Sequence, residues 1–222
     1  MTSVVEPSES KDRKPGSSIR TWLLILLGLA GGLFVGVVGI TWLIGEPIIG
    51  GPNFHGTVIR SPEPAANFTL LNVDSEEVSL KDFRGRVVLL YFGYTYCPDV
   101  CPATMTELKQ AVEEIGNRAK DVQVIMISVD PERDSPEQLQ NYVSHFHDSF
   151  IGLSGTEEEI LGITTQYGVF YEKHEGTVAS GYLIDHTATV IVIDREGKLR
   201  LVYPFNTQSE DIASDLRYLV RH

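Results

Sequence analysis

Two cysteines, Cys97 and Cys101, are the residues of this chain best suited to chemistry. They are its only cysteines, and they enclose the short run Pro-Asp-Val. A thiol pair at this spacing can form a structural disulfide, exchange disulfides with a partner, or bind a soft metal ion. As a structural staple it would be weak, because a bridge that closes so short a loop removes little entropy from the unfolded chain. The spacing therefore favours a reactive or metal-binding pair.

The sequence around the cysteines predicts a buried strand before them and a helix after them. Residues 87–92 form a continuous apolar run between Gly85 and Gly93, which is typical of a central strand. Apolar residues then recur at helical spacing over 102–120, with Pro102 expected at the first helical position. At such a junction, unpaired N–H groups and the helix dipole favour thiolate. If helical geometry already starts at Val100, the sulfurs are close enough for either a disulfide or a shared ion.

The other elements predict an α/β domain with a mixed sheet flanked by helices. Three capping boxes predict the starts of three helices. The box Ser135–Gln138 starts a helix that runs to about 145, Thr156–Glu159 one that runs to about 167, and Thr207–Glu210 one that runs to the chain end. One hairpin is expected at 68–73 with 78–80, and another at 189–193 with 199–203. Single strands are expected at 122–129 and 169–171. Strands that alternate with helices imply a parallel pair joined through the helix after the cysteines. The order of strand, cysteine-bearing loop and helix is the thioredoxin arrangement.

His186 is the histidine whose position best suits a third ligand. It lies in the segment 182–187, just before the first strand of the last predicted hairpin, and this loop faces the cysteine turn in a thioredoxin-like fold. The other histidines fall in a tether, near the ends of elements or at the terminus. Thioredoxin-like oxidoreductases carry a cis proline in this loop, whereas no proline occurs here between Pro136 and Pro204. Two thiolates suit Cu(I), and an added imidazole also accommodates Cu(II).

An uncharged run from Trp22 to Ile44 precedes the folded part. As a helix with about 1.5 Å rise per residue, it matches a hydrocarbon core of about 30 Å. Basic residues precede the run and none follows it until Arg60, so the amino terminus is expected in the cytoplasm. The run lacks a cleavage site, and the acidic residues Glu6, Glu9 and Asp12 of the tail argue against a mitochondrial presequence. Both observations favour an uncleaved anchor in a bacterial cytoplasmic membrane. The predicted organisation is a cytoplasmic tail (1–21), a transmembrane helix (22–44), a tether (45–66) and an extracytoplasmic thioredoxin-like copper-binding domain (67–222).

The acidic composition limits the kinds of partner. The chain has 18 Lys and Arg against 30 Asp and Glu, a formal net charge of −12. It has no polybasic surface of the kind that neutralises phosphates, so nucleic-acid binding is not expected. An acidic body suits basic partner surfaces or cations, and a solvated face that keeps the domain soluble accounts for it as well.

Three blocks of sequence together resemble the SCO/SenC copper-chaperone family. In chain order, the blocks are Tyr91–Pro102, Asp130–Pro136 and Asp185–Thr187. The resemblance spans roughly 52–222 and includes the single amino-terminal anchor. It implies that Cys97, Cys101 and His186 are copper ligands, one copper per site. It also implies that the protein helps to metallate the dinuclear copper centre of cytochrome c oxidase subunit II.

Acidic residues in or beside these blocks have simpler explanations. The middle block, 130–136, ends a strand and starts a helix, so turn and cap chemistry explains most of it and no catalytic role is assigned. Asp99 lies between the cysteines and Asp185 lies beside the histidine. Each is a candidate for orienting a ligand, and a cap or a local hydrogen bond accounts for each equally well.

Three classes of function follow from these residues. The first is a membrane-anchored copper metallochaperone that serves oxidase subunit II, with another copper chaperone or a thiol reductant as a further partner. The second, an enzyme, is a thiol-disulfide reductase that keeps the copper-ligating cysteines of subunit II reduced, which requires the cysteine pair but not His186. The third is a structural module with an incidental disulfide. A peroxidase is disfavoured because Thr95 lies two residues before Cys97, whereas peroxiredoxin-like sites place a threonine three before.

Overall fold

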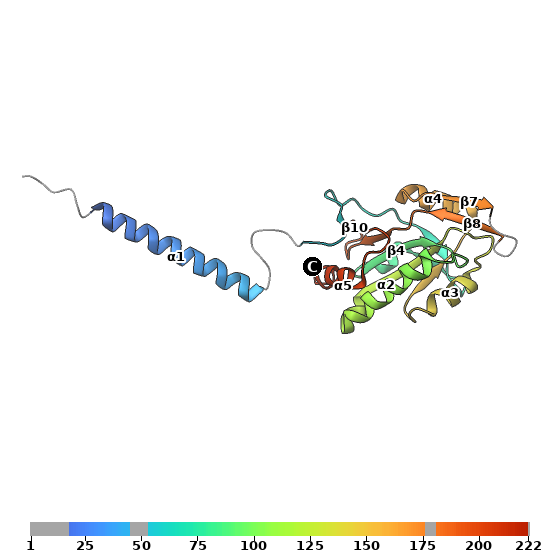
Figure 1. Cartoon of the computed structure of the whole chain (residues 1–222), viewed down its shortest axis with the longest axis horizontal. Coiled ribbons are helices and arrows are strands. Elements are labelled where there is room, and N and C mark those ends of the chain that lie inside the picture. Colours follow the sequence, from blue (N-terminus) through green and yellow to red (C-terminus); the bar gives the residue numbers. More distant parts are fainter. Residues whose placement is uncertain (1–17, 45–52, 176–180, 222) are drawn as a thin grey trace, which may run out of the picture. The chain divides into compact units, whose positions relative to one another are not determined.

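The computed structural model describes residues 18–44, 53–175 and 181–221, and the chain divides into two units between Asn53 and Phe54 (Figure 1). The first unit contains helix α1 (Ser18–Ile44), so the helix starts inside the predicted tail 1–21. Its stretch Thr21–Gly39 is long and apolar enough to cross a membrane, by length and composition. Residues 1–17 of the predicted tail and 45–52 of the predicted tether lie outside the described residues.

A six-stranded mixed sheet forms the centre of the second unit, in the order β1-β10-β9-β4-β5-β6. Its strands are β1 (Thr57–Val58), β4 (Val87–Gly93), β5 (Val122–Ser128), β6 (Ile151–Leu153), β9 (Val190–Ile193) and β10 (Leu199–Tyr203). Strands β4, β5 and β6 run parallel, and β9 runs antiparallel to β4. Every residue of β4 and β5 is buried, as expected for strands covered on both faces.

Helices flank this sheet: α2 (Val100–Glu114), α3 (Pro136–Ser144), α4 (Glu157–Tyr167) and α5 (Ser209–Leu219). In Figure 1, α2, α3 and α5 lie below the sheet, and α4 lies above it. Helix α2 joins β4 to β5, so the βαβ unit that follows the cysteine loop is the predicted one. Two 3₁₀ helices, at Leu80–Phe83 and Gly116–Asp121, complete the helical elements of the described residues. The thioredoxin-like α/β prediction is confirmed.

Several local predictions are also confirmed. The first hairpin is present as β2 (Thr69–Leu71) and β3 (Glu77–Ser79), and the last is β9 with β10. The capping box of α3 forms, with the Gln138 backbone N–H donating to Ser135 Oγ at 3.2 Å. The capping box of α4 forms in the same way, with the Glu159 N–H donating to Thr156 Oγ1 at 3.3 Å. Short-range cap chemistry is therefore read correctly from the sequence at these two positions.

Two predictions at helix starts are wrong. Helix α2 begins at Val100 with Asp99 as its N-cap, so Pro102 is the third helical residue and not the first. Proline is tolerated there because the first N–H groups of a helix have no intrahelical acceptor. Helix α5 begins at Ser209, after the N-cap residue Gln208, whose side chain makes no cap hydrogen bond. The Thr207 hydroxyl, expected to cap the helix, donates to the Pro204 carbonyl oxygen at 2.8 Å instead. The helix ends at Leu219.

The largest difference concerns the strand predicted at 169–171. The strand there is β7 (Tyr171–Glu175), and it pairs with β8 (Tyr182–His186) in a two-stranded sheet of its own. Non-local pairing between segments on either side of 176–180 creates this hairpin, and no local turn signature predicts it. His186 therefore ends a strand and does not lie in a free loop.

The folded unit begins at Phe54, inside the range 45–66 predicted as a tether. Strand β1 pairs with β10, and the Ala65 backbone N–H donates to the Gly197 carbonyl oxygen at 2.9 Å. The segment is rich in glycine and proline, but it still packs on the domain, because its backbone groups hydrogen-bond to the edge of the sheet. The division of the chain into four parts otherwise stays a prediction.

Candidate metal centre

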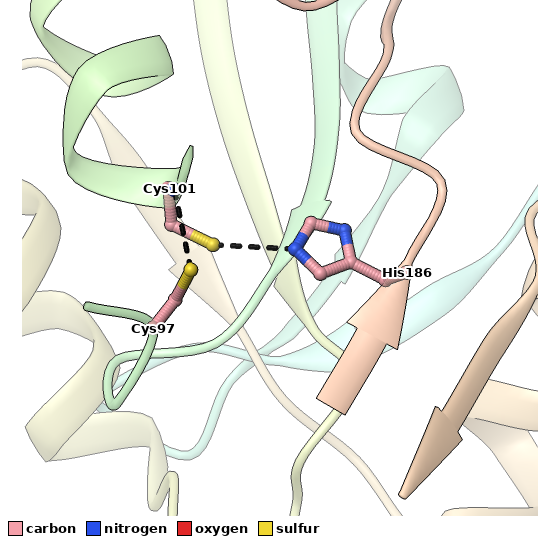
Figure 2. Close-up of side chains that lie close together, drawn as sticks. All are labelled: Cys97, Cys101 and His186. Carbon is pink, nitrogen blue, oxygen red and sulfur yellow. Dashed lines mark hydrogen bonds between the residues drawn. The ribbon is translucent and has the colours of Figure 1, made fainter. Parts of the chain in front are cut away.

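Three side chains from two distant segments meet beside the amino-terminal end of α2 (Figure 2). The sulfurs of Cys97 and Cys101 and a ring nitrogen of His186 all lie within 4.8 Å of one another. The Cys101 sulfur is 3.4 Å from His186 Nε2. All three residues proposed from the sequence are therefore brought together, and both cysteines are free thiols.

The cysteines occupy the junction predicted for them. Strand β4 ends at Gly93, and Cys97 follows in a turn closed by its N–H donating to the Tyr94 carbonyl oxygen at 3.3 Å. Cys101 lies in the first turn of α2 and is fully buried, whereas Cys97 is half-buried. The Cys101 backbone N–H donates to the Cys97 sulfur at 3.4 Å. The helix start thus directs an otherwise unpaired N–H group at one thiol.

Glycine is required at the end of β4 because the cysteine turn approaches closely. A Cβ atom at Gly93 would lie 3.0 Å from the Cys101 sulfur and 2.8 Å from the Tyr91 ring. Both distances are shorter than van der Waals contact. The absence of a side chain at Gly93 therefore makes the space that the buried sulfur occupies.

His186 is held between two tyrosine rings from the opposite segment. Its ring contacts Tyr91 and Tyr94 edge-on, with both centroid separations at 6.0 Å. Nδ1 lies 3.4 Å from the Thr187 carbonyl oxygen, and an N–H at that nitrogen leaves the lone pair on Nε2, which faces the sulfurs. The Ile184 backbone N–H of the same strand donates to the Tyr94 hydroxyl at 3.2 Å. The ring is therefore oriented to offer Nε2 as a ligand.

The two thiols differ in their readiness to ionise. The pKa of Cys97 is lowered to about 3, chiefly by a hydrogen bond from Cys101 and further by His186 and backbone N–H groups. The pKa of Cys101 is raised by that same bond, in which it is the donor, and by burial. One negative charge is thus shared by the pair and resides on the more accessible sulfur. Cys97 is therefore the better nucleophile of the two, and Cys101 would have to give up its proton for both sulfurs to bind one ion.

The block 130–136 does more than turn the chain, which the sequence analysis missed. The carboxylate of buried Asp134 accepts from the Thr95 N–H at 3.0 Å, the Thr95 hydroxyl at 2.5 Å and the Ser128 hydroxyl at 2.6 Å. Thr95 lies two residues before Cys97. Asp134 therefore ties the cysteine turn to the end of the neighbouring strand β5.

Arg133 of the same block connects the cysteine turn to the histidine strand. Its guanidinium pairs with buried Asp130, stacks 3.6 Å from the Tyr182 ring centroid and donates to the Tyr182 carbonyl oxygen at 3.0 Å. It also lies 4.8 Å from the centroid of Tyr96, next to Cys97. The Tyr182 hydroxyl donates to Asp130 at 2.5 Å. The position of this block after β5 could have revealed its role from the sequence. The carboxyl ends of the parallel strands β4 and β5 meet at one edge of the sheet, where the cysteine turn also lies.

The two aspartates considered as orienting residues lie on different elements, Asp99 at the start of α2 and Asp185 in β8. Asp99 is the N-cap residue of α2, without a side-chain cap hydrogen bond. The Asp185 carboxylate points to the outer face of the hairpin, where it lies 3.1 Å from His174 Nε2 with 78% of its side chain exposed. Among the described residues, neither carboxylate is hydrogen-bonded to any of the three candidate ligands.

Two thiols and an imidazole form a soft donor set that suits copper or zinc and disfavours hard cations. Metal–sulfur and metal–nitrogen bonds to such ions are roughly 2.0–2.3 Å, so two donors of one ion lie at most about 4.6 Å apart. The 3.4 Å between Cys101 and His186 falls within that limit. A hollow lined by Cys97, Pro98 and His186 opens over the site, so an ion can reach it from outside.

The fold and the site together define a thioredoxin-like protein with two thiols and an imidazole grouped so that they could hold a metal ion. In the comparison with known proteins, residues 59–221 match the family model described as SCO1/SenC. The chain belongs to the SCO1/SenC family.

Relatives and solved structures cover most of the second unit. The solution structure of apo Sco1 from Thermus thermophilus is 42% identical, with a TM-score of 0.68, over 75% of this chain and 97% of that one. The crystal structure of Arabidopsis thaliana ScoI with copper bound is 34% identical, with a TM-score of 0.67, over 72% and 99%. The SCO2-like protein of Rickettsia felis is 31% identical over 173 residues, which are 78% of this chain and 83% of that protein.

Proposed function

We propose that this protein is a membrane-anchored copper metallochaperone that binds one copper ion through Cys97, Cys101 and His186 and delivers it during cytochrome c oxidase assembly. The observation that carries the proposal is the convergence of two thiols and one imidazole nitrogen within 4.8 Å. Similar Sco proteins from Arabidopsis thaliana and Bradyrhizobium japonicum have been solved with copper bound. Copper therefore suits these donor atoms, and it is the ion bound in those two similar proteins.

The unequal burial of the ligands suits a cargo that must be released. Cys101 is fully buried, whereas Cys97 and His186 line the hollow at the surface. An incoming thiolate of an acceptor can reach the ion from the side of Cys97 and displace that ligand first. Cys101, held in α2, then leaves last. The copper ion can thus pass to the acceptor through an intermediate held by ligands of both proteins, without being released into water.

The acceptor in this proposal is the dinuclear copper centre of cytochrome c oxidase subunit II. The Sco family is described as one of cytochrome c oxidase assembly proteins. Helix α1 would act as the single membrane anchor, with the amino terminus in the cytoplasm and the metal site outside a bacterial cytoplasmic membrane. An anchored chaperone has a high effective concentration near a membrane-bound acceptor.

A copper titration of the reduced full-length protein in detergent tests the proposal. The wild-type protein is expected to bind one equivalent and to show a thiolate-to-Cu(II) absorption band. Cys97→Ser and Cys101→Ser are expected to lose the band, and His186→Ala to lose or shift it with weaker retention of copper against a chelator. A His186→Ala band identical to that of the wild type would remove His186 from the ligand set, and no wild-type band would reject the proposal.

A thiol-disulfide reductase is the second candidate, because the low pKa of half-buried Cys97 beside a buried thiol also suits disulfide exchange. The Cys97 thiolate would attack a disulfide of the target and release one target thiolate. Cys101 would then attack Cys97, releasing the second target thiolate and leaving a Cys97–Cys101 disulfide. A dithiol reductant would restore the pair.

A reduction assay on a disulfide peptide of oxidase subunit II separates the two functions. A reductase is expected to keep most of its activity in His186→Ala and to lose it in Cys97→Ser. A metallochaperone is expected to require all three residues for transfer of copper to the reduced peptide. Reduction lost in both variants would count against a pure reductase.

A further inference from the structure

Tyr91 carries a buried hydroxyl that none of the roles above uses. It lies in the middle of β4, between Met126 of β5 and Val190 of β9, and its side chain is fully buried. Among the described residues, its hydroxyl oxygen has no hydrogen-bond partner. A buried hydroxyl without a partner is costly, since it has given up water without a replacement. The position therefore calls for an acceptor that this state of the site does not supply.

The sulfur of Cys101 adjoins the Tyr91 ring and can become an acceptor. One point beside Gly93 lies 2.8 Å from an edge atom of the Tyr91 ring and 3.0 Å from the Cys101 sulfur, so the two side chains adjoin. The Tyr91 ring also contacts His186, the third candidate ligand. Tyr91 thus forms the inner wall of the metal centre.

In the metal-free protein, Cys101 beside this hydroxyl is a free thiol. A neutral thiol is a weak acceptor. When Cys101 binds a metal ion it loses that proton, and the thiolate has lone pairs available for a donor.

We propose that Tyr91 is a positioning residue whose hydroxyl donates a hydrogen bond to the Cys101 sulfur when that sulfur binds copper as a thiolate, and that this bond favours Cu(I) over Cu(II). The inference rests on the proposed copper site and adds to it the preferred oxidation state. A hydrogen bond to a ligating sulfur withdraws electron density from it. Cu(II) depends more on that density than Cu(I) does, so the bond raises the reduction potential of the bound copper.

The test compares wild type with Tyr91→Phe, which removes only the hydroxyl. In Tyr91→Phe the thiolate-to-Cu(II) band is expected to move to lower energy, because the sulfur becomes a better electron donor. The preference for Cu(I) over Cu(II) is expected to fall by about tenfold, which is about 59 mV for a one-electron couple. Absorption spectra and a mediated redox titration measure the two effects.

Tyr142→Phe is the matched control. Tyr142 in α3 also has a buried hydroxyl without a partner among the described residues, and it is not one of the groups that hydrogen-bond either cysteine. Its band and potential are expected to equal those of the wild type. In the metal-free protein, both Tyr→Phe variants are expected to keep or raise the melting temperature, because each removes an unsatisfied group.

The outcomes separate this inference from the function on which it rests. A wild-type band that Tyr91→Phe leaves unchanged would overturn the hydrogen bond and leave the copper site standing. A clear fall in the melting temperature of metal-free Tyr91→Phe, absent in Tyr142→Phe, would also overturn it, since the hydroxyl would then have a partner without metal. No band in any variant would reject the copper site itself.

Discussion

The turn that carries Cys97 and Cys101 lies between two elements of the central core, whereas the hairpin that carries His186 forms a two-stranded sheet of its own. Strand β4 is buried throughout, and α2 packs against α5. In contrast, most residues of β7 are exposed, and Ile184 is the buried residue of β8. The sulfurs are therefore placed by the core of the domain, and the imidazole is placed by a peripheral hairpin.

Individual side-chain contacts fasten that hairpin to the cysteine turn and to the block 130–136. They include the hydrogen bond from Ile184 to Tyr94, the stacking of Arg133 on Tyr182, and the bond from Tyr182 to Asp130. A site whose ligands have such unequal support can keep its sulfurs fixed while the nitrogen ligand adjusts. This difference in support between the sulfurs and the nitrogen suits the proposed function, in which the protein binds copper firmly and also releases it.

The largest effect is expected from Arg133→Met, which acts on both regions. It leaves the fully buried Asp130 carboxylate without its cation, and loss of one member of a buried pair costs about 3 kcal/mol or more. Urea unfolding of the metal-free protein measures the loss. Release of copper to a chelator is expected to quicken in the folded variant, because β8 loses its anchor.

Arg217→Met is the control for that change. Arg217 pairs with Glu114 on the surface, with 41% and 40% of the two side chains exposed, and such pairs contribute less than about 1 kcal/mol. Copper release is expected to equal that of the wild type. Equal losses of stability in the two variants would show that Arg133 does not join the two regions.

A second change, Gly93→Ala, acts on the cysteine side alone. The added methyl group meets the Cys101 sulfur and the Tyr91 ring at or below 3.0 Å, and overpacking of this kind costs about 1–3 kcal/mol. We expect lower stability in urea and weaker copper binding. Gly162→Ala, in the interior of α4 with nothing within 4 Å, is expected to be neutral or stabilising by up to about 1 kcal/mol. A Gly93→Ala protein that binds copper like the wild type would show that the sulfur has room to move.

The same contrast explains which features could be predicted from the sequence. The cysteine turn, the buried strand before it and two capping boxes depend on residues close in sequence, and all were predicted. The pairing of β7 with β8 depends on a register across 176–180, and single-sequence patterns carry little information about such pairing. His186 was identified from its residue type and its place before the last hairpin, but its strand was not.

The role of 130–136 was missed for a related reason. Local turn and cap preferences explain Asp130, Ser135 and Pro136, so nothing in the block demanded a further role. The contacts that matter join Asp134 to Thr95 and Arg133 to Tyr182, which are 39 and 49 residues away. The first contact requires β4 and β5 to be aligned side by side, and the second requires β8 to lie against the end of β5.

A third prediction concerns the asymmetry inside the cysteine pair. The pKa of Cys97 is lowered from 9.0 to about 3, so between those values the folded protein holds a thiolate where the unfolded chain holds a thiol. The unfolded state then binds more protons, so this group stabilises the fold increasingly as pH rises through that window and loses its contribution as pH falls through about 3.

Alkylation by iodoacetamide measures this asymmetry directly. The rate for Cys97 in the folded, metal-free protein is expected to change little between about pH 5 and 8, whereas in urea it falls about tenfold per pH unit below the ordinary thiol pKa. In Cys97→Ser, the buried Cys101 is expected to stay unmodified in the folded state. A folded-state rate that climbs tenfold per unit would mean that neither thiol is ionised near neutral pH.

The smallest effect is expected at the outer face of the hairpin. Asp185 is next to His186 in sequence, but its carboxylate lies 3.1 Å from His174 Nε2 with 78% of the Asp185 side chain exposed. An exposed pair of this kind contributes at most about 1 kcal/mol. Asp185→Asn is therefore expected to change unfolding free energy by less than about 0.5 kcal/mol and copper affinity by less than about twofold. A competition titration against a copper chelator measures the affinity, with His174→Gln as the matched change on the other partner. A tenfold loss in Asp185→Asn but not in His174→Gln would mean that Asp185 supports His186 directly, and that the peripheral hairpin shapes the site more than its exposure indicates.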